Sequence, residues 1–223
     1  MSLYSPTRLV IKTPALQPME QATPLKLLRS ADVYQQIFVK YSQCGTFHSY
    51  AELLHAALLE ADATVEMFVP QPFRVSIGSS NYIPDCYFVK NGVRVIREIR
   101  SKALFPEEWR APLTEFWKER GMTFEIISNA EIYARETEAL NWLQIVQTLV
   151  SATTQDTELI EDDVSFQIAR AGTLTLDEIL SDGDDFTCFG KLLAVYRLLH
   201  RGRLTANLNN EAINYNTEFR HVA

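Results

Sequence analysis

Residues 82–100 have the sequence YIPDCYFVKNGVRVIREIR, and this stretch decides the fold. Two runs rich in β-branched and aromatic residues, Tyr82 to Lys90 and Val93 to Ile99, flank the pair Asn91-Gly92. An Asn-Gly pair between two such runs is a strong signal for a two-residue β-hairpin turn. The stretch therefore predicts two paired antiparallel strands.

The hairpin is predicted to bring two acidic side chains together. Pairing across the turn places Asp85 opposite Glu98. Glu98, Arg100 and Lys102 alternate along the second strand and share one face, whereas Ile99 points to the other. Opposed carboxylates repel each other unless a cation lies between them, and their hard oxygens favour Mg²⁺ or Mn²⁺. The pattern favours a divalent-ion site, although Pro-Asp followed by Glu-x-Arg also arises by chance.

The neighbouring segments predict the elements around the hairpin. A helix is expected from Ser49 to about Asp62, with Ser49 as its N-cap and Glu52 completing a capping box. Other patterns predict a strand at Phe73 to Ile77, a helix at Pro106 to Arg120 and a strand at Phe124 to Ile127. The order helix, three strands, helix, strand predicts an α/β fold with a mixed sheet flanked by helices.

The two ends of the chain differ from this central part. Residues 1–28 contain several prolines without periodicity and are expected to form an extended arm. The boundary between a central domain at 29–135 and a C-terminal domain at 136–223 is placed at the start of a helix over 136–151. After a loose acidic stretch, Gln155 to Asp163, the pattern predicts helices at Leu174 to Leu180 and Phe186 to His200, then a hairpin from Arg203 to Phe219 that turns at Asn209-Asn210. That layout is winged-helix-like.

Composition restricts the classes of function. The chain has a formal net charge of −7, so DNA binding requires a local basic patch or partners that deliver the DNA. Cys44, Cys86 and Cys188 lie far apart without CxxC spacing, which argues against a disulfide framework and a zinc site. Neither a signal pattern nor a membrane span is indicated, so a cytoplasmic location is expected.

Two groups of cations are candidate DNA contacts. The predicted hairpin carries Lys90, Arg94, Arg97, Arg100 and Lys102 against Glu98 alone, which indicates a patch for the DNA backbone or else an ordinary solvated strand edge. The second group lies on or after the last long helix, where a winged helix presents its recognition element. Its members are open to DNA contact or to protein docking: Lys191, Arg197, Arg201 and Arg203.

Several segments resemble the TnsA family, the endonuclease subunit of heteromeric cut-and-paste transposases. The segments are SYAELLHAALLE at 49–60, PQPF at 70–73, YIPDCYFV at 82–89, EIR at 98–100 and WKERGMTFEIISNAEI at 117–132. The resemblance implies a restriction-endonuclease-like PD-(D/E)xK nuclease domain that requires Mg²⁺. It implies metal ligands at Glu52, Asp85, Glu98 and Ile99, and a catalytic set of Glu52, Asp85, Glu98, Arg100 and Lys102.

The resemblance also implies partners. In that family this subunit cuts the 5′ strands at transposon ends, while a DDE-type transposase subunit, TnsB-like, cuts and joins the 3′ ends. A small C-terminal winged-helix-like domain engages an AAA+ ATPase regulator, TnsC-like, and contributes DNA contacts. The substrate implied for this chain is therefore DNA at transposon ends.

One position departs from the family pattern. Arg100 stands where the pattern has lysine, and arginine can hold a phosphate but cannot shuttle a proton. Lys102, on the same predicted face, is the alternative source of an ammonium group. Three functions stay open: a transposon-end endonuclease, a catalytically impaired nuclease-fold module that serves as an assembly scaffold, and a stand-alone restriction or repair nuclease, which the acidic charge disfavours.

Overall fold

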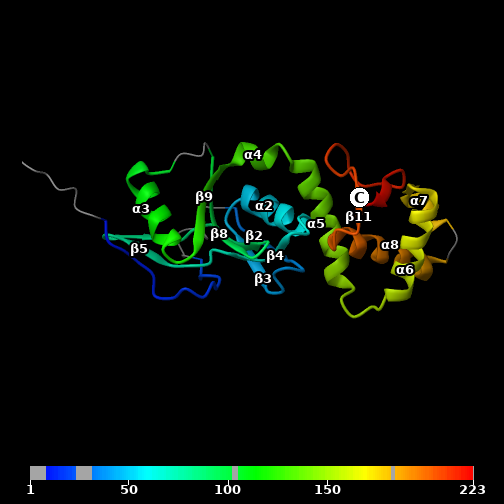
Figure 1. The fold of residues 1–223 in the computed structure, drawn as a ribbon, viewed down its shortest axis with the longest axis horizontal. Helices are drawn as coiled ribbons and strands as arrows, with labels where there is room; N and C mark the ends of the chain where they lie inside the picture. The colour runs from blue at the N-terminus through cyan, green and yellow to red at the C-terminus, as the bar shows by residue number, and fades with distance from the viewer. Residues whose placement is uncertain (1–8, 24–31, 102–104, 182–183, 223) are drawn as a thin grey trace, which may run out of the picture.

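A computed structural model of the chain describes residues 9–23, 32–101, 105–181 and 184–222. These residues form seven helices and four sheets, so the predicted α/β class is confirmed. Figure 1 shows the main sheet and helix α2 (Tyr50–Ala61) in one half of the molecule and helices α6 to α8 at the other end, with α5 (Glu136–Ser151) between them. No helix in these ranges has the length and apolar character of a membrane span.

The predicted hairpin forms the middle of the main sheet. Strands β7 (Cys86–Lys90) and β8 (Val93–Arg100) pair antiparallel, and both turn residues, Asn91 and Gly92, have positive φ angles of 49° and 74°. Such angles are those of the turn that Asn-Gly favours. Helix α3 (Glu107–Lys118) then leads to β9 (Met122–Ser128), which pairs parallel to β8, as the predicted crossover requires.

The predicted three-strand meander is wrong. The run from Tyr82 to Lys90 is broken at residues 83–85, where Pro84 has no N–H for a ladder hydrogen bond. As a result, β6 (Ser80–Tyr82) pairs with β5 (Val75–Ile77) in a separate sheet, whereas β7 pairs with β4 (Val65–Pro70), a strand that the sequence analysis did not predict. The break leaves Asp85 outside any strand, directly before β7.

The described part of the N-terminal arm is extended and lies on the core. Its strand β1 (Ile11–Lys12) joins the sheet in the order β1-β5-β6. Further along, the Met19 and Gln21 amides each donate a 3.0 Å hydrogen bond, to the carbonyls of Pro72 and Gln71. A second unpredicted hairpin, β2 (Tyr34–Ile37) and β3 (Cys44–Phe47), follows the arm.

Helix α2 confirms the predicted helix and its N-cap. The Ser49 hydroxyl accepts a hydrogen bond from the Glu52 amide at 3.2 Å. The reciprocal bond of a capping box differs from the prediction, because the Glu52 carboxylate accepts the His48 amide instead, at 3.0 Å. Leu54 and Ala57 are fully buried, and α2 packs on α5.

The C-terminal part contains one helix where a loose acidic stretch was predicted. Helix α6 (Glu158–Ala171) forms because Val164 and Ile168 are fully buried, and α6 packs on α8 (Asp185–His200). The acidic residues that suggested a loop lie at its start, where negative charge suits a helix N-terminus. The remaining elements are β10 (Leu174–Thr175), α7 (Leu176–Leu180), β11 (Leu204–Ala206) and β12 (Glu218–His221).

The terminal ribbon forms as predicted, but its connection differs. Strands β11 and β12 pair antiparallel, and β10 adds a third strand in the order β10-β12-β11. The connection spans residues 207–217, so it is longer than a tight turn at Asn209-Asn210. Asn141 of α5 holds this loop through Nδ2, which donates to the carbonyls of Leu208 and Glu211 at 2.8 Å each. Helix α5 thus contacts both α2 and the C-terminal part, and the predicted boundary at residue 136 stays a prediction.

Candidate active site

A pocket of about 520 Å³ opens where β7 begins and β8 ends. Two of the three predicted carboxylates, Glu52 and Asp85, line it together with Arg100. The third, Glu98, is fully buried. The other lining residues are His48, Gln71, Arg74, Asn81 and Ile83.

Asp85 lies beside Glu98, as the hairpin register predicts. Cys86 pairs with Arg97 in the ladder, so the next position outward sets Asp85 against Glu98. The Ile99 amide donates a 2.7 Å hydrogen bond to Asp85 Oδ2. Burial raises the pKa of the Asp85 carboxyl well above its ordinary value, and the charges of Glu98 and Glu52 raise it further.

Glu98 is held by two neighbours. The Tyr82 hydroxyl donates a hydrogen bond to Oε2, and the Arg100 guanidinium forms an ion pair with Oε1 that lacks hydrogen-bond geometry. Burial raises the pKa of Glu98 to about 7, and the opposing charge of Arg100 does not compensate for it. Since the Arg100 side chain is 44% exposed, solvent weakens its effect on the buried carboxyl.

Glu52 reaches the pocket from the first turn of α2. Its Oε1 accepts a hydrogen bond from the Ser49 hydroxyl at 2.9 Å. Its Oε2 accepts two, from the His48 amide at 3.0 Å and from Gln71 Nε2 at 2.8 Å. These donors stabilise the ionised form, yet burial is the largest effect and raises the pKa of Glu52.

The arrangement has too little positive charge for its carboxylates. The charges of Glu52 and Glu98 raise the pKa of Asp85, the charge of Glu52 also raises the pKa of Glu98, and the charge of Arg100 lowers the pKa of all three carboxyls. Hard oxygen donors with surplus negative charge suit Mg²⁺ or Mn²⁺. Within the described ranges, however, no three His, Cys, Asp or Glu side chains are already grouped as a metal cage. Glu52 and Asp85, which line the pocket, could therefore act as ligands of a divalent ion. Glu98 instead forms its ion pair with Arg100.

Ile99 and Lys102 complete the predicted set. Ile99 is buried, pairs with Ile127 across the parallel ladder and holds Asp85 through its amide. Its predicted part as a metal ligand stays a prediction. Lys102 lies outside the described residues.

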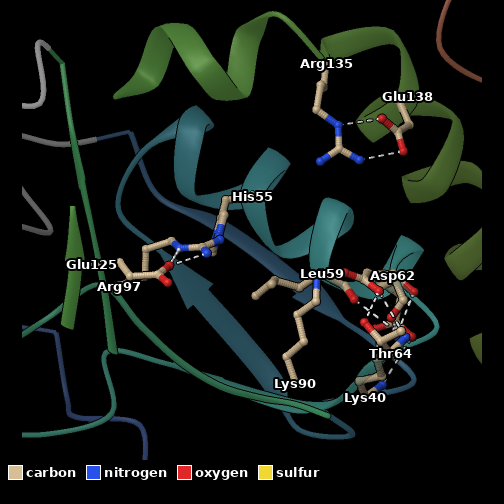
Figure 2. Close-up of polar contacts among 11 residues, drawn as sticks. Lys40, His55, Leu59, Asp62, Thr64, Lys90, Arg97, Glu125, Arg135 and Glu138 are labelled. Atoms are coloured by element: carbon tan, nitrogen blue, oxygen red, sulfur yellow. Dashed lines mark hydrogen bonds and ion pairs between the residues drawn. The ribbon is translucent and has the colours of Figure 1, made fainter. Parts of the chain in front are cut away.

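The cations of the hairpin do not form one patch. Arg97 projects to the face opposite Arg100, where its Nη2 lies 2.5 Å from Glu125 and its Nη1 lies 3.0 Å from His55 Nε2. Figure 2 shows this group below α2, together with Lys90, which pairs with Asp62 at 2.6 Å. Strand alternation thus separates Arg97 from Arg100, and DNA contact by the hairpin cations stays a prediction. Arg94 Nη2 is also engaged, donating to the Arg120 carbonyl at 3.2 Å.

The C-terminal cations likewise divide into two kinds. Arg197 is mostly buried and donates to the Ala152 carbonyl at 3.1 Å and to the Thr157 hydroxyl. Arg201 forms an ion pair with Glu161 of α6. These two arginines hold α8 against neighbouring segments. Lys191 is half-buried and Arg203 is exposed, and DNA contact by all four stays a prediction.

One prominent residue of the pocket had only a weak sequence signal. Gln71 is 3% exposed and has a φ angle of 42°, which non-glycine residues rarely adopt. Its position between Pro70 and Pro72 was compatible with substrate contact or with a simple turn. Arg74 and Asn81, also in the lining, carried no signal because their approach depends on the β5-β6 pairing.

No protein-family model matches the chain, and no curated protein matches it either.

Proposed function

We propose that this chain is a divalent-metal-dependent DNA endonuclease of the restriction-endonuclease-like class, acting as the TnsA-like subunit of a transposase complex. The observation that carries the proposal is that Glu52 and Asp85 line one pocket, with buried Glu98 beside Asp85 and Arg100 paired to Glu98. Three carboxylates in so little space are destabilising in the folded chain, and a bound cation would offset their repulsion.

The residues of the pocket have distinct parts in phosphodiester hydrolysis. Glu52 and Asp85 would hold the ion, with Glu98 as the third carboxylate. A bound Mg²⁺ neutralises charge at the scissile phosphate and lowers the pKa of a water molecule. Arg100, whose guanidinium lines the pocket and stays protonated, is suited to hold a phosphate oxygen rather than to move a proton.

Dependence on partners follows from the charge of the whole chain. With a net charge of −7 and its hairpin arginines on two faces, the chain offers little phosphate neutralisation by itself. We infer that a DDE-type transposase and an AAA+ ATPase deliver transposon-end DNA, which the chain cuts on the 5′ strand. The C-terminal part, with Lys191 and Arg203 free of the α6 ion pairs described above, is the proposed winged-helix-like contact for DNA or partner.

The test is cleavage in a reconstituted mixture. Wild type is combined with a TnsB-like DDE-type transposase, a TnsC-like AAA+ ATPase, DNA bearing the element ends that this transposase recognises, and Mg²⁺. We expect 5′-strand cleavage that Asp85→Ala lowers by about 10³-fold, as losing a central electrostatic group does. Asp163→Ala, at an exposed aspartate of α6, is the matched control and should cut normally. Equal cleavage by wild type and Asp85→Ala would refute the proposal.

A second candidate has its own supporting observation. Arg100 pairs with Glu98 where the family pattern has lysine, and this ion pair occupies one predicted ligand. A nuclease-fold module that has lost catalysis and serves as an assembly scaffold would have this arrangement. Such a module would support complex assembly and DNA binding equally well as wild type and as Asp85→Ala, with no cleavage by either.

A further inference from the structure

Gln71 has an unusual combination of burial, backbone strain and an unpartnered oxygen. Its side-chain Oε1 is buried and has no hydrogen-bond partner, although the residue lines the carboxylate pocket. A buried carbonyl oxygen without a donor destabilises the folded chain, so such an atom calls for a specific explanation. A φ angle of 42° at a non-glycine residue adds a further cost, of the kind that clusters at functional sites.

The rest of Gln71 is fixed by three different segments. Its amide donates to the Asp85 carbonyl at 2.9 Å, and its carbonyl accepts the Gln21 amide of the N-terminal arm at 3.0 Å. Its side-chain Nε2 donates to Glu52 Oε2 at 2.8 Å. Turning the amide over would set Oε1 against the Glu52 carboxylate, so the charge of Glu52 determines which end faces it. The orientation that leaves Oε1 without a partner is therefore the favoured one.

We propose that Gln71 is a positioning residue of the site, which fixes Glu52 through Nε2 and presents Oε1 as an additional hard oxygen toward a divalent ion or its hydration shell. The inference rests on the proposed function, because it needs an ion in the pocket. It explains why the strained backbone persists: Gln71 joins α2, the arm and the approach to β7 at one point. It also explains why an amide is used, since a fourth carboxylate would add to the repulsion.

The test is calorimetric titration of the full chain with Mn²⁺ alone, beside thermal unfolding of the same variants. Gln71→Met keeps the size of the side chain and removes both polar atoms. Gln71→Gly removes the side chain and relieves the backbone, because glycine adopts positive φ angles without strain. Gln21→Met is the matched control, since Gln21 bonds to the same loop through its amide and Nε2 but lies away from the carboxylates.

We expect both Gln71 variants to bind Mn²⁺ about tenfold more weakly than wild type, the effect typical of losing a group that orients a ligand. Gln21→Met should bind like wild type. Gln71→Gly should unfold at a temperature no lower than Gln71→Met, which separates ion binding from stability. One result would overturn the role of Gln71 but not the metal site itself. In that result Asp85→Asn no longer binds Mn²⁺, whereas Gln71→Met binds it within twofold of wild type. Absence of Mn²⁺ binding in wild type overturns the proposed function, and this inference with it.

Discussion

The two faces of strand β8 carry similar charged residues, but the charges are neutralised on one face and not on the other. On one face, Arg97 has a carboxylate, Glu125, and a buried imidazole, His55, as partners. On the other face, Arg100 forms an ion pair with Glu98, and the charges of Glu98 and Glu52 still raise the pKa of Asp85. Neighbouring residues of one strand thus form a neutralised, structural group on one side and an unneutralised group on the other. The difference indicates where the proposed divalent ion would bind.

A second cavity gives the same contrast in its lining. A space of about 330 Å³ below α2 is lined by His55, Arg97, Lys90, Asp62 and Arg135, among others. Its cations each have an acidic partner, and Figure 2 shows Arg135 bound to Glu138 and Lys90 beside Asp62. Burial and the charges of Arg97 and Arg135 lower the pKa of His55 well below its ordinary value, so it is neutral at pH 7. The charges of the residues named in this lining are therefore neutralised.

Among changes to strand β8, the largest expected effect comes from removing Arg100. Arg100→Ala should lower cleavage in the reconstituted mixture by about 10²-fold, because the guanidinium that would hold the phosphate is lost. Arg74→Ala, which removes another arginine of the pocket lining, is the comparison. Normal cleavage by Arg100→Ala together with loss in Lys102→Ala would show that the ammonium group, and not Arg100, has this role.

Disrupting the neutralised group around Arg97 should lower the stability of the fold and leave catalysis intact. Arg97→Ala removes the partner of Glu125 and of buried His55, as well as the guanidinium group that lies over the Phe88 ring. We expect a loss of about 1–3 kcal/mol in the free energy of unfolding, measured by urea denaturation with an unchanged slope. Cleavage per folded molecule should equal that of wild type. A catalytic defect in folded Arg97→Ala would contradict the division between the faces.

The unbalanced face should make stability depend on pH. The pKa of Glu98 is raised to about 7 in the folded chain, above its ordinary value of 4.5. The stability that its protonated form contributes is therefore fully present below about pH 4.5 and lost as the pH rises through about 7. Glu98→Gln should flatten this decline in thermal unfolding experiments without divalent ions. Glu211→Gln, in an exposed loop, is the control and should keep the wild-type dependence of stability on pH. The same dependence in Glu98→Gln as in wild type would contradict this prediction.

The smallest effect is expected at the rim of the balanced cavity. Lys90 and Asp62 form an exposed ion pair, with side chains 47% and 33% accessible. Lys90→Ala should change the free energy of unfolding by less than about 1 kcal/mol. Added salt should alter this difference by no more than that same amount. A loss as large as that of Arg97→Ala, measured by the same urea titration, would mean that burial does not govern this face.

Sequence predicts the local parts of this molecule better than their assembly. The Asn91-Gly92 turn, the N-cap at Ser49 and the register of Asp85 against Glu98 follow from short-range chemistry. The interruption at Pro84 was legible in principle, because proline cannot donate to a ladder. Strand β4 was not, since its pairing with β7 is a contact between distant segments.

The site shows the same limit. Pattern alone selected Glu52, Asp85 and Glu98, but it did not show that Arg100 would pair with Glu98 or that Arg97 would pair with Glu125. Those outcomes depend on burial and on partners brought by other strands. Gln71 illustrates the point further, because its strained backbone and unpartnered oxygen exist only in the folded chain.

The most direct measurement is the thermal unfolding midpoint above pH 7 with and without saturating Mg²⁺, for wild type and Asp85→Asn. An ion that binds only the folded state stabilises it, and the carboxylates at the end of the β7-β8 hairpin are the groups that need it. We predict that Mg²⁺ raises the midpoint of wild type by several degrees and leaves Asp85→Asn unchanged. No shift in wild type, or the same shift in both proteins, would contradict the account.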